Sequence, residues 1–139
     1  MHAHQLMMKN ILRSVRENQR ILNLSVAAAS GAGIRLELTG QIKKLDMMER
    51  ELQQIAERRG WDMLESGYRF PGRTIRQLRA GKTADPDIAQ LLIHAYINTM
   101  IQSQKMLRQL PYPDRPMESA VETIRDCLFG CIFRLLSQL

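Results

Sequence analysis

The chain has 139 residues, of which 45% are hydrophobic and only 5% aromatic, and it carries a formal net charge of +6. This length and hydrophobic content suit one globular domain over residues 1–139 and argue against a disordered chain. No apolar run approaches the roughly 20 residues that a membrane span needs, and charges interrupt the N-terminal segment too early for a secretory signal. We therefore expect a cytoplasmic protein without a membrane span.

Apolar residues at spacings of three and four predict a first helix from about Gln5 to Ala29. Its apolar stripe is interrupted at Asn18 and Gln19, and the pattern leaves open whether these side chains lie inside the fold or on its surface. The glycines of segment 30–33 end the helix, because glycine destabilises helices and readily caps them.

A second helix is predicted from Ile34 to Arg59, because its apolar residues form a nearly unbroken stripe of helical period. We expect Gly60 to end it. A long connection over 61–84 follows, with a short helical piece predicted at 73–79. Bundles with one long crossover between the second and third helices are a known variant, which the ferritin-like group uses.

A third helix is predicted to begin at Asp85 and run to about Gln109, with Asp85 capping its first amides. A proline-rich bend leads to a fourth helix that opens at Pro116. The end of the fourth helix is apolar on more than one side, with Phe129 and Phe133 forming a second ridge. We expect this end to be deeply buried or to contact another subunit. The predicted fold is all-α: a ferritin-like four-helix bundle with a long crossover connection between helices 2 and 3.

The chain carries no complete catalytic, cofactor-binding or metal-binding motif, and we predict that it is not an enzyme and holds no cofactor. The di-metal site of ferritin-like bundles requires Glu-x-x-His pairs, and Leu91 stands at that spacing before His94. His2 and His4 lie in a terminus that we expect to fray. Glycine-rich phosphate-binding loops and nucleophile elbows do not occur in the sequence. We expect His94 to be structural.

Cys127 and Cys131 lie one helical turn apart on the predicted fourth helix. Neighbours on one helix face seldom form a disulfide, and two cysteines are too few for a zinc site. We expect two buried, reduced thiols.

The most unusual charge feature is the long connection, because the charges between Glu65 and Asp85 are all basic. A helix at 73–79 would place several of them on one face, where they could bind phosphate groups. The candidate anion-binding residues are Arg69, Arg73, Arg76 and Arg79. The alternative, which we favour, is that they pair with acidic residues of the second and fourth helices, namely Glu49, Glu57, Glu118 and Glu122. Nothing here resembles a known nucleic-acid-binding module, so we do not expect nucleic acid as a partner.

An alanine run at 27–29 is followed by a short break and a long amphipathic helix that closes on Glu57-Arg58-Arg59-Gly60-Trp61. With these features the segment 27–62 resembles the spore coat protein F family, small ferritin-like proteins of spore-forming bacteria. Position 62 is aspartate where the family tends to have tyrosine. The resemblance implies a ferritin-like bundle without metal chemistry, which self-associates as a structural component of a spore layer.

Three functions are compatible with these observations. The first is a non-enzymatic structural or interaction protein that forms a homo-oligomer and, in a spore coat, contacts other coat proteins. The second is a ferritin-like binder of a metal or small molecule that lacks a complete di-iron site. The third is an anion- or nucleic-acid-binding module that uses the basic connection.

Overall fold

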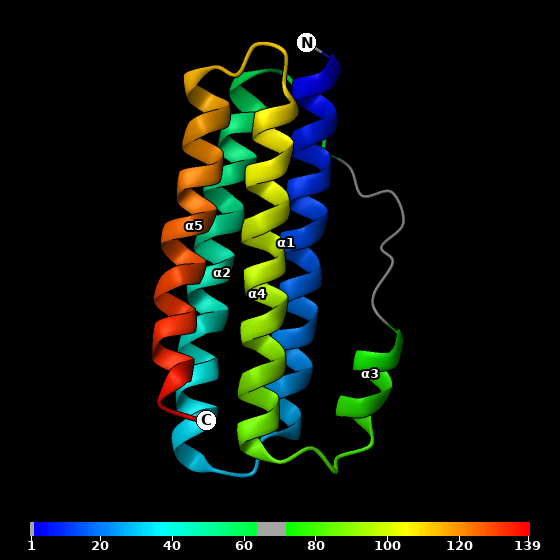
Figure 1. The fold of residues 1–139 in the computed structure, drawn as a ribbon, viewed down its shortest axis with the longest axis vertical. Helices are drawn as coiled ribbons and strands as arrows, with labels where there is room; N and C mark the ends of the chain where they lie inside the picture. Colours follow the sequence, from blue (N-terminus) through cyan, green and yellow to red (C-terminus); the bar gives the residue numbers. More distant parts are fainter. Residues whose placement is uncertain (1, 64–71) are drawn as a thin grey trace.

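The computed structural model describes residues 2–63 and 72–139, which form helices and no strand (Figure 1). The five helices are α1 (His2–Ala28), α2 (Ala32–Arg58), α3 (Gly72–Arg79), α4 (Asp85–Gln109) and α5 (Arg115–Leu136). The predicted all-α class is confirmed. The four long predicted helices agree with α1, α2, α4 and α5 to within a few residues at each end, and α3 adds a fifth helix where a short helical piece was predicted.

The four long helices lie side by side, and each packs against two of the others. Contacts join α1 to α2, α2 to α5, α5 to α4 and α4 to α1, while α3 packs against α1. In Figure 1, α1 and α5 run downwards whereas α2 and α4 both run upwards. Because α2 and α4 run in the same direction, the end of α2 and the start of α4 lie at opposite ends of the molecule (Figure 1).

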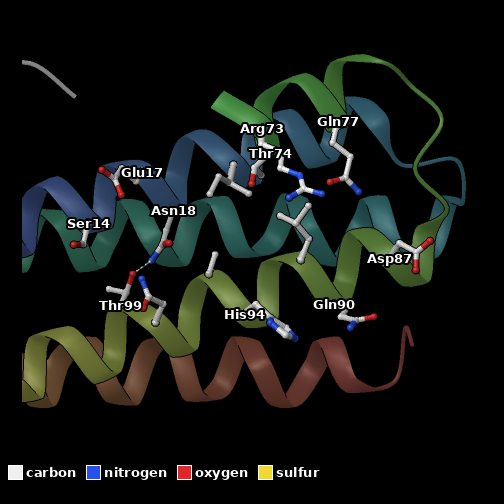
Figure 2. A pocket seen from close by; sticks show the side chains of 14 residues that line it. Ser14, Glu17, Asn18, Arg73, Thr74, Gln77, Asp87, Gln90, His94 and Thr99 are labelled. Carbon is white, nitrogen blue, oxygen red and sulfur yellow. Dashed lines mark hydrogen bonds between the residues drawn. The ribbon is translucent and has the colours of Figure 1, made fainter. Parts of the chain in front are cut away.

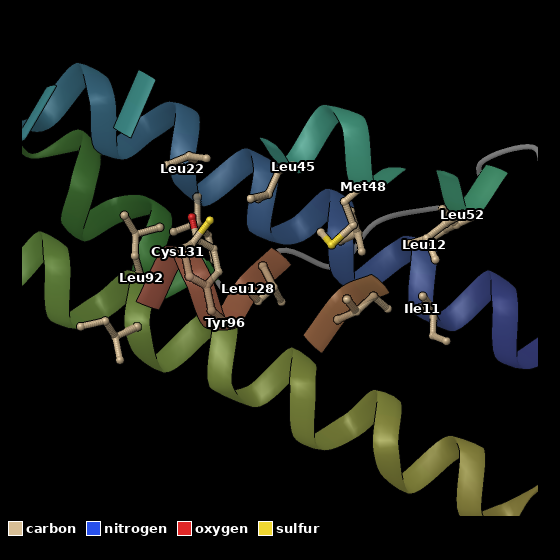
Figure 3. Close-up of a cluster of buried hydrophobic side chains, with 14 of the residues drawn as sticks. Ile11, Leu12, Leu22, Leu45, Met48, Leu52, Leu92, Tyr96, Leu128 and Cys131 are labelled. Atoms are coloured by element: carbon tan, nitrogen blue, oxygen red, sulfur yellow. The ribbon is translucent and has the colours of Figure 1, made fainter. Parts of the chain in front are cut away.

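Each long helix buries the apolar stripe that predicted it. On α2, for example, Leu38, Leu45 and Leu52 are fully buried at a spacing of seven residues. Figure 3 shows these stripes meeting between the helices. Fully burying an aliphatic side chain of this size stabilises the fold by about 1.5–3 kcal/mol, so the stripes account for the helical packing.

Tyr96 is among the largest fully buried side chains, although the sequence pattern did not place it in the core (Figure 3). Its hydroxyl donates a hydrogen bond to Oε1 of Gln41 (3.0 Å), and the Gln41 amide donates to the backbone oxygen of Cys131 (3.3 Å). Gln41 is itself buried. These bonds satisfy polar atoms that would be costly to bury alone, and they link α4, α2 and α5.

The two polar residues that interrupt the stripe of α1 occupy different environments. Asn18 is 2% exposed, and its Nδ2 donates a hydrogen bond to Oγ1 of Thr99 on α4 (2.8 Å). Gln19 is only half-buried and donates to Asp46 of α2 (3.0 Å). The interior of the fold therefore contains a buried polar contact between α1 and α4.

The helix ends correct two predictions and confirm a third. Asp85 belongs to the first turn of α4 instead of capping it, and its carboxylate accepts hydrogen bonds from the backbone amides of Ser30 and Gly31. The N-terminal segment is helical from His2, and His4 bonds through Nε2 to the backbone oxygen of Tyr112 (2.8 Å). Gly60 follows the end of α2 with a φ of +69°, a conformation that favours glycine.

Candidate functional site

Three of the four candidate arginines lie on α3. Arg69 falls outside the described residues. Arg73, Arg76 and Arg79 are all exposed, whereas Leu78 of the same helix is buried. Arg76 donates from Nε to the backbone oxygen of Gly72 (3.3 Å). Within the part of the chain that the structure describes, none of these three arginines forms an ion pair with a carboxylate.

Three of the acidic residues suggested as their partners pair with other arginines. Glu49 pairs with Arg16 (3.4 Å), while Glu118 and Glu122 both pair with Arg115 (3.7 and 3.1 Å). The sequence could not reveal this, because the pairing depends on which helices are neighbours.

Arg73 differs from the other two arginines because it lines a cavity. The cavity has a volume of about 600 Å³ and lies between α1, α3 and α4 (Figure 2). Leu78 anchors α3 against α1, and Arg73, Thr74 and Gln77 face the cavity from α3. Figure 2 shows Arg73 and Gln77 extending from α3 into this space.

The opposite walls of the cavity come from one face of α1 and one face of α4. Helical spacing places Ser14, Glu17, Asn18 and Ile21 on the same side of α1, since they follow each other at intervals of three, one and three residues. The α4 wall repeats every four residues, as Leu91–Ala95–Thr99 and Gln90–His94–Asn98. The lining thus combines apolar side chains with amides, hydroxyls and charged groups.

Glu17 is the acidic residue in the cavity lining whose pKa is shifted. Partial burial raises the pKa of its carboxyl above the ordinary value, and the charge of Arg13, one turn earlier on α1, opposes the shift. No hydrogen bond to the Glu17 carboxyl occurs among the described residues. A carboxyl that is partly desolvated and accepts no hydrogen bond from the described residues favours a ligand group that can donate a hydrogen bond or carry positive charge.

The buried Asn18–Thr99 pair on the cavity wall also has hydrogen-bonding groups without a partner among the described residues. Asn18 donates through Nδ2 to the hydroxyl oxygen of Thr99, which leaves the Asn18 carbonyl oxygen and the Thr99 hydroxyl hydrogen without a partner among the described residues. The sequence pattern predicted a structural role for His94. The structure leaves His94 exposed at the cavity edge (Figure 2).

A second feature is an exposed apolar surface on α4 and α5, which we call the α4–α5 face. Phe129 and Phe133 are 62% and 71% exposed. The α4–α5 face comprises these two residues together with Leu136, Ile97 and Ile101. In this single chain the apolar end of the fourth predicted helix is therefore not deeply buried, which leaves contact with another subunit as the prediction for it.

The α4–α5 face borders a groove between the two helices, and one of its members, Ile101, lines that groove. Ile101 and Arg125 both line a groove of about 340 Å³ between the two helices. Ile97 lies one turn from Ile101 on α4, and Phe129 and Phe133 continue from Arg125 at intervals of four residues on α5. No Asp, Glu, Lys or Arg occurs at 88–104 of α4 or at 127–133 of α5. The face is thus apolar and free of charged residues at its centre, a signal that was present in the sequence.

The two cysteines are free thiols that differ in burial. Cys131 is buried and Cys127 is half-buried, with its Sγ 3.7 Å from the backbone oxygen of Lys44. The hydrogen bond with Cys127, together with burial, raises the pKa of the Cys131 thiol. A thiol with a raised pKa is a poor nucleophile, so Cys131 fits a packing role.

Comparison of the chain with protein-family models, curated proteins and solved structures finds no match. Within residues 2–63 and 72–139, no three His, Cys, Asp or Glu side chains gather in a way that could hold a metal ion. Over the same residues, no helix combines the length and apolar character that crossing a membrane requires. The cavity between α1, α3 and α4 and the α4–α5 face are therefore the candidate binding sites of the described chain.

Proposed function

We propose that the protein is a non-enzymatic structural or interaction protein that assembles with further copies of itself through the α4–α5 face. The observation that carries this proposal is the uncharged apolar centre of that face. The cores of protein interfaces are depleted of charged residues and enriched in aromatic ones, and Phe129 and Phe133 stand at this centre.

The size of the face suits a protein partner. An aromatic side chain carries roughly 150–250 Å² of surface, so the two phenylalanines and three aliphatic side chains together expose on the order of 400–500 Å². Apolar patches of this size on single chains are often functional. A standard interface buries about 800 Å² per partner, and the neighbouring uncharged polar residues of α4 would supply the remainder.

The absence of charge at the centre of the face lets a second copy of the same chain bind there despite the net charge of both molecules. Two molecules that each carry a net charge of +6 repel each other at long range. An interface centred on residues without charge brings no like charges into contact, because the basic groove residues Arg125 and Lys105 lie at its edge. A two-fold arrangement would place the same face on both subunits.

The proposal includes a ferritin-like four-helix bundle formed by α1, α2, α4 and α5, with α3 as an insertion in the long crossover. Its support is the ring of contacts among the four long helices and the parallel course of α2 and α4 (Figure 1). In this arrangement α4 and α5 are neighbours at the surface, so one continuous face can join two subunits.

Light scattering coupled to size-exclusion chromatography tests self-association over a range of protein concentrations. The wild-type chain should elute as a dimer or larger species, and the variant Phe129→Glu/Phe133→Glu as a monomer. Leu36→Glu is the matched control, because Leu36 is 76% exposed on α2, outside the α4–α5 face. A wild-type monomer at all concentrations, or equal dissociation by the control, would contradict the proposal.

A spore coat is the setting that the resemblance of segment 27–62 supports for this assembly, and coat proteins would then be additional partners. A fluorescent fusion followed through growth and sporulation should concentrate on the developing spore. A diffuse signal at every stage would exclude the coat role and would leave self-association to be decided by the chromatography.

A further inference from the structure

We propose that the cavity between α1, α3 and α4 binds a small zwitterion of the amino-acid class, with the ligand carboxylate on Arg73 and the ligand ammonium group on Glu17. This site is separate from the α4–α5 face, and its occupation does not depend on self-association.

Arg73 provides the anion-binding group. It extends from α3 into the cavity and has no carboxylate partner among the described residues (Figure 2). A guanidinium group binds a planar carboxylate through two parallel hydrogen bonds, which makes it the side chain best suited to this ligand group. Arg73 is the one Lys or Arg side chain in the described lining.

Glu17 provides the complementary acceptor from the opposite wall. Its carboxyl is partly desolvated and has no hydrogen bond from the described residues. An ammonium group of the ligand would donate a hydrogen bond to this carboxylate. Its positive charge would also stabilise the ionised carboxylate, which partial burial disfavours. Arg13 stays exposed and does not line the cavity, so the position beside Glu17 is open to a ligand.

The rest of the lining fits a small organic body. Ile21, Leu91 and Ala95 offer apolar contact, and the Asn18–Thr99 pair offers one free acceptor and one free donor. The volume of about 600 Å³ lies in the usual range for small-molecule pockets.

The balance of charge in the lining selects against strongly anionic ligands. Two carboxylates, Glu17 and Asp87, face the cavity together with the single arginine. A phosphate dianion or a nucleotide would gain one favourable interaction and meet two repulsive ones. A zwitterion instead presents one charge of each sign.

Thermal-shift measurements on the full chain, with each of the L-amino acids of proteins added singly at millimolar concentration, provide the first test. The best probe is then titrated by calorimetry beside its analogue without the amino group, its analogue without the carboxylate, and inorganic phosphate. We expect the intact amino acid to bind and each one-charge analogue to bind roughly tenfold more weakly, because one charge-assisted contact is lost.

Paired variants locate the site. Arg73→Ala should weaken binding of the amino acid roughly tenfold and leave the amine analogue unaffected, while Glu17→Gln should show the converse selectivity. Arg76→Ala on the same helix and Glu51→Gln on α2 are the matched controls, since both side chains are exposed and outside the cavity. The proposal is overturned if no amino acid binds, if inorganic phosphate binds as tightly, or if the controls weaken binding equally.

Discussion

Asp85 and Gly31 are held together across the end of the molecule where α1 turns into α2 and α4 begins. The Asp85 carboxylate accepts hydrogen bonds from the backbone amides of Ser30 (2.8 Å) and Gly31 (2.9 Å). A Cβ atom at position 31 would lie 3.0 Å from Oδ2 of Asp85, so glycine permits this close approach. Because α2 has no side-chain cap of its own, the carboxylate from α4 binds an amide that the start of a helix leaves free.

Replacement of Asp85 by alanine should therefore destabilise the fold. We expect the free energy of unfolding to fall by about 2 kcal/mol, because two hydrogen bonds to a charged acceptor are lost. Chemical denaturation followed by circular dichroism measures this loss. Asp87→Ala removes the same charge from the same helical turn and should cost about 0.3–1 kcal/mol through the helix dipole alone. Equal losses in the two variants would show that the contact with the α1–α2 turn contributes nothing.

The Asp85 contact illustrates what the sequence can and cannot predict about this fold. Apolar periodicity located the long helices, since each one buries a single stripe against its neighbours. Capping by Asp85 was predicted from local sequence, but the amides it binds lie 54 and 55 residues earlier in the chain. Tyr96 was missed for the same reason, because the Gln41 side chain that satisfies its hydroxyl belongs to another helix.

Replacement by alanine should have opposite effects on stability at Gly40, in the middle of α2, and at Gly60, just after its end. Gly60 has a φ of +69°, which costs an L-residue about 1–2 kcal/mol. Gly40 lies inside α2, is exposed, and has open space where a Cβ would be added. We expect Gly60→Ala to destabilise the protein by about 1 kcal/mol and Gly40→Ala to stabilise it by about 0.5–1 kcal/mol. Urea denaturation of both variants decides this, and a stabilising Gly60→Ala would contradict the left-handed turn.

Tyr96→Phe should reveal the cost of leaving a buried amide unpaired. Burial raises the pKa of Tyr96 well above its ordinary value, so its hydroxyl remains a donor to Gln41 throughout the physiological pH range. Without the hydroxyl the Gln41 carbonyl loses its partner, and we expect a loss of about 1–3 kcal/mol in the free energy of unfolding.

A double-mutant cycle separates this hydrogen bond from simple packing. Gln41→Met combined with Tyr96→Phe removes both partners, so the double variant should lose less stability than the sum of the two single variants. Strict additivity would mean that the Gln41–Tyr96 contact has no energy of its own.

The cavity could be predicted less well than the helices. The basic connection predicted Arg73 as an anion-binding residue, but whether Arg73 and Glu17 line the same cavity depends on how α3 packs against α1. Asn98 lines the cavity, but its local sequence is the same as that of a polar residue exposed to open solvent. The local sequence therefore cannot predict that it belongs to a cavity wall. The α4–α5 face differs, because its uncharged stretches can be read directly from the sequence.

Arg59 and Asp114 connect the end of α2 to the start of α5 and make stability depend on pH. Arg59 donates a hydrogen bond to the Asp114 carboxylate, which also caps α5 by accepting from the Met117 amide (3.1 Å). Burial alone would raise the pKa of Asp114, but these hydrogen bonds outweigh it, and the pKa is lowered. A carboxyl whose pKa is lower in the folded state contributes stability above its unfolded pKa of about 3.9. That contribution is lost as the pH falls through the folded value.

Asp114→Asn should therefore remove part of the acid sensitivity of the fold. Near neutral pH the variant should be less stable than the wild type, because asparagine still caps α5 but no longer pairs with the charge of Arg59. Below about pH 4 the difference should shrink, since the carboxyl becomes protonated first in the unfolded state and then, at lower pH, in the folded state. Urea denaturation at intervals between neutral pH and strong acid measures the free energy of unfolding of both proteins.

Asp126→Asn, which alters an exposed carboxylate paired with the neighbouring Arg125, is the control and should show the same pH dependence as the wild type. If the free energies of unfolding of Asp114→Asn and wild type differ by the same amount at every pH, the lowered pKa of Asp114 does not contribute to stability.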